Sequence, residues 1–157
     1  MYSTQYIRYL NFPPIPSSII ESINPTILLE SFKQDVKEHK KNPSMYETYT
    51  WTDESNAELN AWCQDNICAD MYYAFQIITG ILPIHKDNGT KIKLNYIVIP
   101  GGANVITEFY NDDLTTKLAS YSILANKWHV FKADTYHSVS NIDPDQIRLG
   151  ITARIFE

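Results

Sequence analysis

The stretch ILPIHKDNG, residues 81–89, places a histidine and an aspartate two positions apart, at His85 and Asp87. On an extended chain such side chains project to the same side, so an imidazole nitrogen and a carboxylate oxygen can converge on one metal ion. The pair alone does not establish a site, because a chain of this composition contains such a pair by chance with a probability of roughly one in four. Asp87 capping the Asp-Asn-Gly turn is the structural alternative.

A non-haem Fe(II) site that binds dioxygen needs a second histidine, because its ligands are two His and one carboxylate that leave three positions open. His129 in KWHVF and His137 in YHSVS both lie downstream. If residues 141–146 form the turn of a hairpin, His137 lies opposite Arg148. We therefore expect His137 to be the third ligand, with a core histidine bonded to a backbone carbonyl as the alternative. His129 is expected in the core or at its rim.

Arg148 lies on a strand whose other face is apolar and therefore predicted to be core. An arginine that points into a β-structure needs an anion, because a buried unpaired charge is costly. A guanidinium binds a carboxylate through two parallel hydrogen bonds, which suits the distal carboxylate of a keto-diacid whose other end chelates iron. The alternative is a structural ion pair with one of three acids: Asp143, Asp145 or Glu108.

Together, His85-x-Asp87, His137 and Arg148 resemble the Fe(II)- and 2-oxoglutarate-dependent oxygenase superfamily. More narrowly, HKDNGTKIKLNYIVI and YHSVSN are similar to small hydroxylase-like members encoded by tailed phages and bacteria, and the likeness covers residues 72–156. The resemblance implies that His85, Asp87 and His137 hold Fe(II) and are the catalytic residues. It also implies that Arg148 holds 2-oxoglutarate in part, and that dioxygen is the oxidant.

The activity that this resemblance implies is a dioxygenase that hydroxylates a substrate and releases succinate and CO2. Many members carry Ser or Thr two residues after the Arg, whereas this chain has Gly150 there. We expect another polar group to hold the cosubstrate carboxylate. Asn95 is the candidate, because Lys93 and Asn95 share one face of a predicted strand and a polar side chain on an inward face needs a partner. Tyr96 takes this place if the two faces are reversed.

The second half of the chain must position these residues on strands. From residue 71 onward, short runs rich in Ile, Val, Tyr and Thr recur every 8–12 residues or so with turn residues between them, a pattern typical of a sandwich or barrel. We predict a mainly β, α+β protein of one domain, residues 1–157. Residues 71–157 form a double-stranded β-helix, a cupin-like jelly roll.

The first part, residues 1–70, mixes strands with helices and is predicted to support the jelly roll. A short helix begins near Ser17 or Ser18, which are its candidate caps, and a longer one begins at Asn24-Pro25. A third helix is predicted within residues 53–75, where apolar residues at 57, 59, 62, 67, 71 and 74 are close to helical spacing, with Asp53 or Ser55 as its cap. Two further strands are expected, near residues 3–12 and 45–51.

The charge balance, 13 basic against 18 acidic residues without a basic patch, argues against nucleic acid as a partner. No apolar run approaches the ~20 residues that span a bilayer and no signal peptide is recognisable, so we expect no membrane association and a cytoplasmic protein, in the host cytosol if it is phage-encoded. The expected substrate is a small molecule or a peptide side chain. Two alternatives stay open: a cupin-type metalloenzyme independent of 2-oxoglutarate, and a non-catalytic jelly-roll binding or structural protein. The sequence does not define the oligomeric state.

Overall fold

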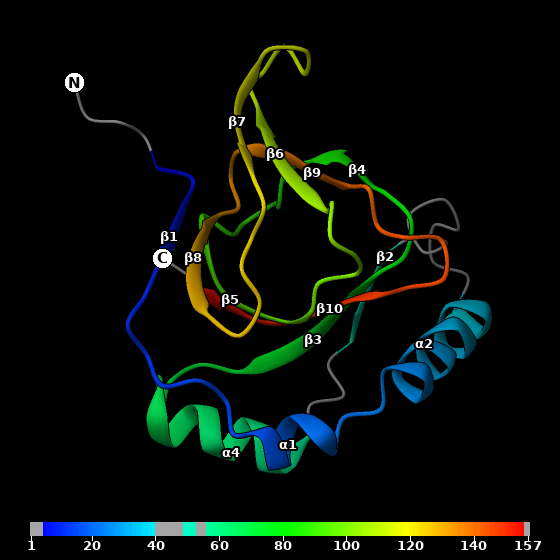
Figure 1. The fold of residues 1–157 in the computed structure, drawn as a ribbon, viewed down its shortest axis with the longest axis vertical. Coiled ribbons are helices and arrows are strands. Elements are labelled where there is room, and N and C mark those ends of the chain that lie inside the picture. The colour runs from blue at the N-terminus through cyan, green and yellow to red at the C-terminus, as the bar shows by residue number, and fades with distance from the viewer. Residues whose placement is uncertain (1–4, 40–48, 53–55, 156–157) are drawn as a thin grey trace.

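Two antiparallel sheets face each other in the computed structural model, which describes residues 5–39, 49–52 and 56–155 (Figure 1). The six-stranded sheet has the order β1 (Ile7–Tyr9), β8 (Trp128–Lys132), β5 (Ile92–Ile99), β10 (Arg148–Ile155), β3 (Tyr73–Ile78) and β2 (Tyr49–Thr52). The four-stranded sheet has the order β4 (Leu82–His85), β9 (Tyr136–Ser140), β6 (Ile106–Tyr110) and β7 (Lys117–Tyr121). Every pair of neighbouring strands is antiparallel. This arrangement is the predicted double-stranded β-helix.

Strand β5 shows why the larger sheet has two different faces. Leu94 and Tyr96 belong to the core that packs toward the helices, whereas Lys93, Asn95 and Ile97 line the interior between the sheets. The side chains alternate because successive residues of a strand point to opposite faces. The faces predicted for this strand are therefore the observed ones, and the alternative that turned Tyr96 toward the interior is wrong.

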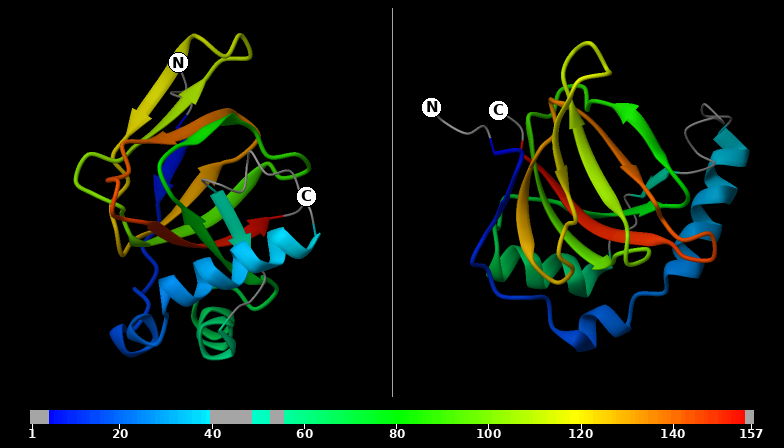
Figure 2. Two further views of the ribbon diagram at one scale, coloured as in Figure 1. Left: turned by 90° about the vertical axis from the view of Figure 1, so that its right-hand side faces the viewer. Right: turned by 45° about the horizontal axis from the view of Figure 1, so that its top comes forward.

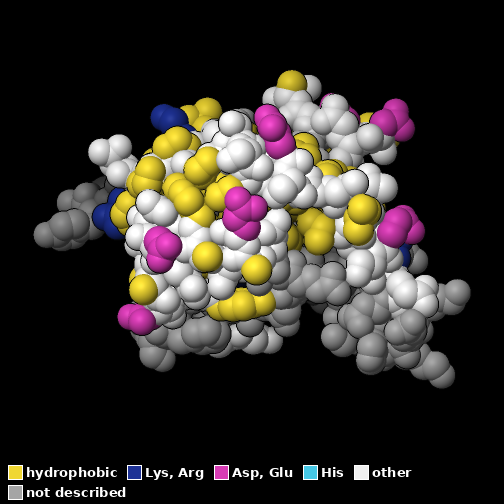
Figure 3. Space-filling model, turned by 90° about the horizontal axis from the view of Figure 1, so that it is seen from below, with side chains coloured by type: hydrophobic (Ala, Val, Ile, Leu, Met, Phe, Trp, Pro, Cys, Tyr) yellow, Lys and Arg dark blue, Asp and Glu magenta, His cyan; other side chains and the backbone are white. Residues whose placement is uncertain are grey.

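The N-terminal helices cover the outer face of the larger sheet (Figure 2). They are α1 (Ser17–Glu21), α2 (Pro25–His39) and α4 (Ala57–Asn66). Ile19 of α1 and Leu59 and Cys63 of α4 enter the same core as Trp128. Viewed from below, this helical face presents apolar side chains with acidic ones scattered among them (Figure 3). These elements bury the outer face and leave the inner face to the site.

The helix caps differ in part from those predicted. Asn24 accepts hydrogen bonds from the backbone N–H groups of Thr26 and Ile27, so it caps α2 as expected. Helix α1 begins after Pro16 without a side-chain cap, so the expected Ser17 or Ser18 cap is wrong. Helix α4 is capped by the side chain of Asn56, and the expectation of Asp53 or Ser55, which lie outside the described residues, is also wrong.

The hairpin expected between β9 and β10 does not form, because these two strands lie in different sheets. His137 is opposite His85 and Phe109, whereas Arg148 is opposite Ile78. Residues 141–147 cross from one sheet to the other, and the backbone N–H of residue 143 donates to the carbonyl of residue 101 at 2.8 Å during this crossing. The predicted pairing is therefore wrong, but both side chains still point into the space between the sheets.

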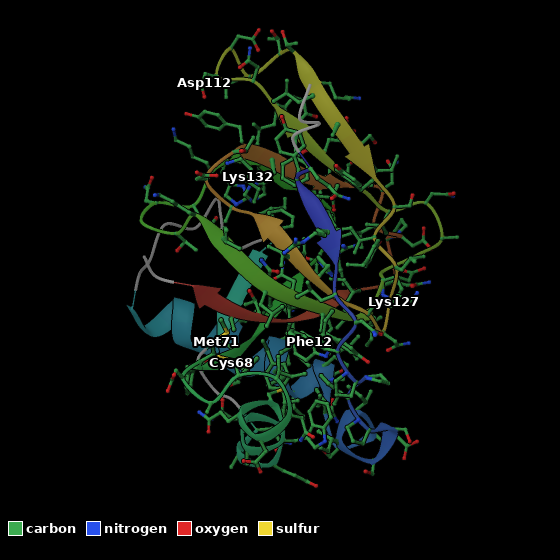
Figure 4. All side chains as sticks on the ribbon, turned by 90° about the vertical axis from the view of Figure 1, so that its left-hand side faces the viewer. Phe12, Cys68, Met71, Asp112, Lys127 and Lys132 are labelled. Carbon is green, nitrogen blue, oxygen red and sulfur yellow. The ribbon has the colours of Figure 1, made fainter. Side chains whose placement is uncertain are left out.

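Strands β6 and β7 extend beyond the body of the barrel as a hairpin with Asp112 near its tip, whereas Cys68 and Met71 lie at the opposite end, beside α4 (Figure 4). Both cysteines, Cys63 and Cys68, are free. Within the described ranges no helix has the length and apolarity needed to cross a membrane.

Candidate metal centre

Two strands of the smaller sheet bring the predicted ligands together. His85 ends β4, Asp87 follows in the next turn, and His137 lies on β9 directly opposite His85. One ligand atom from each of the three residues can be chosen so that all lie within 4.8 Å of one another. His85 Nε2 is 3.5 Å from Asp87 Oδ1. The structure thus places the three side chains as a metal site requires.

Hydrogen bonds to the backbone orient both imidazole rings. His85 Nδ1 lies 2.7 Å from the carbonyl oxygen of Pro83, and His137 Nδ1 lies 2.7 Å from that of Thr135. When Nδ1 donates its proton to a carbonyl, Nε2 keeps its lone pair and can bind a metal. Each ring is fixed by a residue two positions earlier on its own strand, so strand geometry alone presents Nε2 to the site.

The electrostatic surroundings hold His137 and Asp87 in the protonation states that a cation needs. Burial lowers the pKa of His137 to about 4, and the neighbouring His85 lowers it further, so its imidazole is neutral at neutral pH. Burial raises the pKa of Asp87, but the nearby His85 side chain and the Lys93 ammonium hold it well below its usual range. The neutral imidazole of His137 and the carboxylate of Asp87 are thus ready to bind metal without losing protons.

The donor set fits a divalent transition metal. Nitrogen and oxygen ligands bind such ions at about 2.0–2.2 Å, so two ligand atoms on one ion lie up to about 4.4 Å apart. The three ligand atoms lie within 4.8 Å of one another, so their side chains need to move only slightly closer together to bind one ion. Two His and one carboxylate, with the remaining positions open, are the ligands of non-haem Fe(II) oxygenases. The residues therefore fit Fe(II).

Lys93 was recognised in the sequence only as an inward-facing polar residue. It is 4% exposed and its ammonium forms an ion pair with Asp87 Oδ2. A metal ion and this ammonium would both neutralise the same carboxylate. Lys93 therefore belongs to the site, and the signal for it was the alternation of β5, which placed a lysine on an inward face.

Aromatic rings enclose the His137 side of the site. The ring of Phe131 lies 4.8 Å and that of Phe109 6.0 Å from the His137 ring, centre to centre. Tyr6, which precedes β1, stacks on Phe109 at 4.9 Å. These rings keep water from one side of the site, and water exclusion strengthens electrostatic interactions there.

A narrow cavity extends from His137 and Lys93 to Arg148. It is lined by side chains from both sheets, including Lys93, Asn95, His137 and Arg148, and its volume is about 30 Å³. Arg148 is 4% exposed, and its guanidinium donates to the carbonyl oxygen of residue 100 at 3.4 Å. Burial lowers its pKa to about 10, so it remains a cation at neutral pH.

No carboxylate of the described residues forms an ion pair with Arg148. Of the three acids considered as its partner, Glu108 instead pairs with Lys117, and Asp143 accepts a hydrogen bond from Gln146. A buried cation that lacks an anionic partner is costly. Arg148 is therefore arranged to receive an anion in the cavity.

Asn95 is buried in the cavity wall, and its Oδ1 accepts a hydrogen bond from Thr152 Oγ1 at 2.7 Å. Its assignment to the cosubstrate remains a prediction. The sequence did not single out the function of His129, which is fully buried, as expected for a core residue, yet lines the same cavity. The alternation in KWHVF, with Trp128 in the helical core, was the available signal.

Comparison with known proteins gives a fold and no closer relationship. No protein-family model and no curated protein matches the chain. A Pseudomonas putida prolyl-4-hydroxylase structure is 13% identical, with a TM-score of 0.51, over 98% of this chain and 94% of that one. The structure of EvdMO1 is 13% identical, with a TM-score of 0.51, over 99% of this chain. This chain spans only 48% of EvdMO1. The non-heme monooxygenase ThoJ, as a nickel complex, is 10% identical, with a TM-score of 0.50, over 98% and 74% of the two chains.

At 10–13% identity these likenesses define the fold alone. The chain has a double-stranded β-helix fold, as predicted from the sequence, and shares it with the prolyl-4-hydroxylase and non-heme monooxygenase structures.

Proposed function

We propose that this protein is an Fe(II)- and 2-oxoglutarate-dependent dioxygenase that hydroxylates a small molecule or a peptide side chain. The observation that carries the proposal is one cavity lined by His137, a member of the His-Asp-His cluster, and by the buried Arg148, which no carboxylate of the described residues neutralises. A keto-diacid has the matching chemistry, because its keto-acid end chelates a metal and its far carboxylate pairs with a guanidinium. The names of the similar structures, a prolyl-4-hydroxylase and a non-heme monooxygenase, are consistent with this class.

Each residue would have a separate task. His85, Asp87 and His137 would hold Fe(II) on one face and leave the other positions open. Arg148 would bind the distal carboxylate of 2-oxoglutarate and so orient its keto-acid end toward the metal. Bound iron, with 2-oxoglutarate and dioxygen, supplies the oxidation of a substrate C–H bond to C–OH, coupled to conversion of 2-oxoglutarate to succinate and CO2.

Anaerobic titration of the purified protein with Fe(II) and then 2-oxoglutarate tests the proposal. Bidentate chelation of the iron produces a weak visible charge-transfer band, which we expect in the wild type and not in Asp87→Ala. Arg148→Ala should weaken 2-oxoglutarate binding more than iron binding. Iron binding without the band, or a band that survives in Asp87→Ala, would refute the assignment.

The narrowness of the cavity favours a second candidate function. A volume of about 30 Å³ holds about two water molecules, so binding a five-carbon diacid requires side chains such as Lys93 or Arg148 to move. A cupin-type metalloenzyme that acts on a smaller anion without 2-oxoglutarate would need less movement. The same titration separates the two, because this enzyme would bind the metal and show no band with 2-oxoglutarate.

A further inference from the structure

Besides Arg148, which no carboxylate of the described residues neutralises, the cavity wall contains a buried nitrogen without a hydrogen bond. His129, on β8, is 0% exposed, lines the cavity, and its Nε2 makes no hydrogen bond within the described part of the chain. A buried polar atom without a partner costs about 1–3 kcal/mol. Such an atom in a cavity wall therefore indicates a ligand that supplies the missing hydrogen-bond partner.

The backbone contact of His129 leaves its ring free to present a proton to the cavity. Its Nδ1 lies 3.3 Å from the carbonyl oxygen of Lys127, whereas the same contact in His85 and His137 measures 2.7 Å. A hydrogen bond at 3.3 Å is longer than the usual range and weaker. The two candidate ligand histidines are held by short backbone contacts through Nδ1, whereas His129 can give up its weak contact and carry its proton on Nε2 instead.

Thr152, Asn95 and His129 form one polar row across three adjacent strands. Asn95 is opposite Thr152 on β10 and opposite His129 on β8. Thr152 donates to Asn95 Oδ1, so these two groups already satisfy each other in part. His129 ends the row with its buried Nε2, which has no partner among the described residues.

Arg148 and His129 face the same cavity, but the position that would supply a hydroxyl beside Arg148 is empty. Gly150 carries no side chain, although a Cβ there would lie 3.5 Å from Ile97 Cδ1 and 3.9 Å from Gln76 Oε1, which are ordinary contacts. The chain therefore has room for a serine at this position and does not use it. A carboxylate beside Arg148 must find its second donor on another strand.

We propose that His129, as a neutral imidazole, donates its Nε2–H to the distal carboxylate of the bound dicarboxylate and, together with Arg148, selects keto-diacids over keto-monoacids. This role rests on the proposed function, since it names a residue that recognises the cosubstrate of that same site. His129 is a binding residue that contacts neither the metal nor the reacting carbon.

The charged and titratable groups near His129 keep it neutral. Burial lowers its pKa to about 4 and the Arg148 guanidinium on β10 lowers it further. On β1, the Tyr9 ring lies 6.0 Å away, edge to face. On β5, the neighbouring Asn95 is uncharged and Lys93 is paired with Asp87. A neutral imidazole can donate a second hydrogen bond to the distal carboxylate. It adds no further positive charge to a cavity that is already lined by Arg148 and Lys93.

The test compares two ligands on the protein loaded with Zn(II), because this redox-inactive metal does not support turnover. Calorimetric titration measures the dissociation constants of 2-oxoglutarate and of 2-oxobutyrate, which keeps the chelating keto acid and lacks the distal carboxylate. His129→Phe should weaken 2-oxoglutarate binding roughly ten- to a hundredfold, the usual loss for a hydrogen bond to a charged group, and leave 2-oxobutyrate unchanged. His129→Gln, which keeps an N–H donor, should recover most of the affinity.

Two further variants make the test specific. Adding Gly150→Ser to His129→Phe should restore 2-oxoglutarate binding, because the hydroxyl then supplies the missing donor. Thr107→Val removes another cavity hydroxyl, whose Oγ1 also lacks a partner among the described residues, and should leave the preference for the diacid unchanged. Nitrogen-15 NMR of labelled histidine should show His129 protonated at Nε2 in the 2-oxoglutarate complex.

The outcomes separate the two proposals. If the wild type binds 2-oxoglutarate no better than 2-oxobutyrate, no distal carboxylate site exists. This result would refute both the proposed function and the role of His129. If the wild type prefers 2-oxoglutarate but His129→Phe keeps that preference, or weakens both ligands equally, the role of His129 is overturned and the proposed function stands.

Discussion

At the scale of single residues, the ion pair between Lys93 and Asp87 is the unusual feature of this metal site. The ammonium neutralises a carboxylate that a metal would also neutralise, so the metal-free protein is stabilised by the same charge that opposes metal binding. Lys93 thus stabilises the metal-free protein and weakens metal binding, whereas the three predicted ligands strengthen metal binding.

Lys93→Met should therefore have opposite effects on the two forms of the protein. We expect a lower melting temperature without metal, because Asp87 loses its partner, and a larger rise of that temperature on adding Zn(II) than in the wild type. Differential scanning calorimetry with and without Zn(II) measures both. Lys93→Arg, which keeps the charge, is the control, and an unchanged zinc-induced rise in Lys93→Met would contradict this role of Lys93.

Asp87→Asn tests the ligand assignment at the same scale. The substitution keeps the shape of the side chain but removes the charge that binds both Lys93 and a metal ion. We expect Zn(II) affinity to fall at least roughly a hundredfold, beyond the 10–100-fold typical of losing a group behind the ligands. Asp134→Asn, which breaks an exposed pair with Lys132, is the matched control and should bind Zn(II) as the wild type does.

At the scale of elements, the turn between β5 and β6 supports the beginning of β10. Gly101 has a φ of +91°, and a Cβ there would lie 3.2 Å from Arg148 Cβ and 3.3 Å from Arg148 N. Only glycine adopts this backbone conformation readily while allowing such a close approach. The turn therefore contributes to the position of the arginine.

Gly101→Ala should destabilise the protein by about 1–3 kcal/mol and weaken 2-oxoglutarate binding, since the strained backbone and the added methyl group both displace Arg148. Gly89→Ala is the matched control: its φ is +74°, but nothing lies within 4 Å of the added Cβ. It should lose stability without losing ligand affinity. Urea unfolding and calorimetric titration measure the two effects, and equal ligand affinities in both variants would argue against a role for the turn.

The elements also show how far the sequence could predict this site. The alternation of β5 was readable because its apolar face packs on the helices, so the inward direction of Lys93 and Asn95 followed from pattern alone. The position of Arg148 relative to His137 was not readable. A short turn-like segment can reverse a chain within one sheet or carry it to another, and only the contacts of both sheets decide which occurs.

The partners of buried groups were equally unreadable. The pairing of Lys93 with Asp87 joins a strand to a loop, and local pattern contains no information on such a contact. His129 was predicted to lie in the core or at its rim, and it is fully buried. That its Nε2 lacks a partner among the described residues depends on every element around the cavity. The residue types of the site could therefore be predicted from the sequence, whereas the contacts between these residues depend on the fold.

At the scale of the whole molecule, buried His129 couples stability to pH. Its pKa is about 4 in the folded metal-free protein and 6.5 in an ordinary environment. The unfolded chain therefore binds a proton at higher pH than the folded one. The stabilisation from neutral His129 is complete above pH 6.5 and is lost as the pH falls toward 4, to a total of roughly 3 kcal/mol.

His129→Gln should consequently make the stability profile of the metal-free protein less steep between pH 6.5 and 4, because glutamine does not titrate, whereas His137, whose pKa is also lowered to about 4, keeps part of the slope. Chemical unfolding at a series of pH values, compared between the two proteins, measures the difference in free energy of unfolding. Parallel profiles over this range would show that His129 takes up its proton as readily in the folded protein as in the unfolded chain.

The central claim for the whole molecule is that its two sheets together form one site for a metal ion and a keto-diacid. A crystal structure tests this claim most directly, from crystals of the protein grown anaerobically with Mn(II) and 2-oxoglutarate. The account predicts manganese bound to His85, Asp87 and His137, chelated by the keto acid, with the distal carboxylate against Arg148. Manganese bound elsewhere, or a diacid that does not reach Arg148, would contradict it.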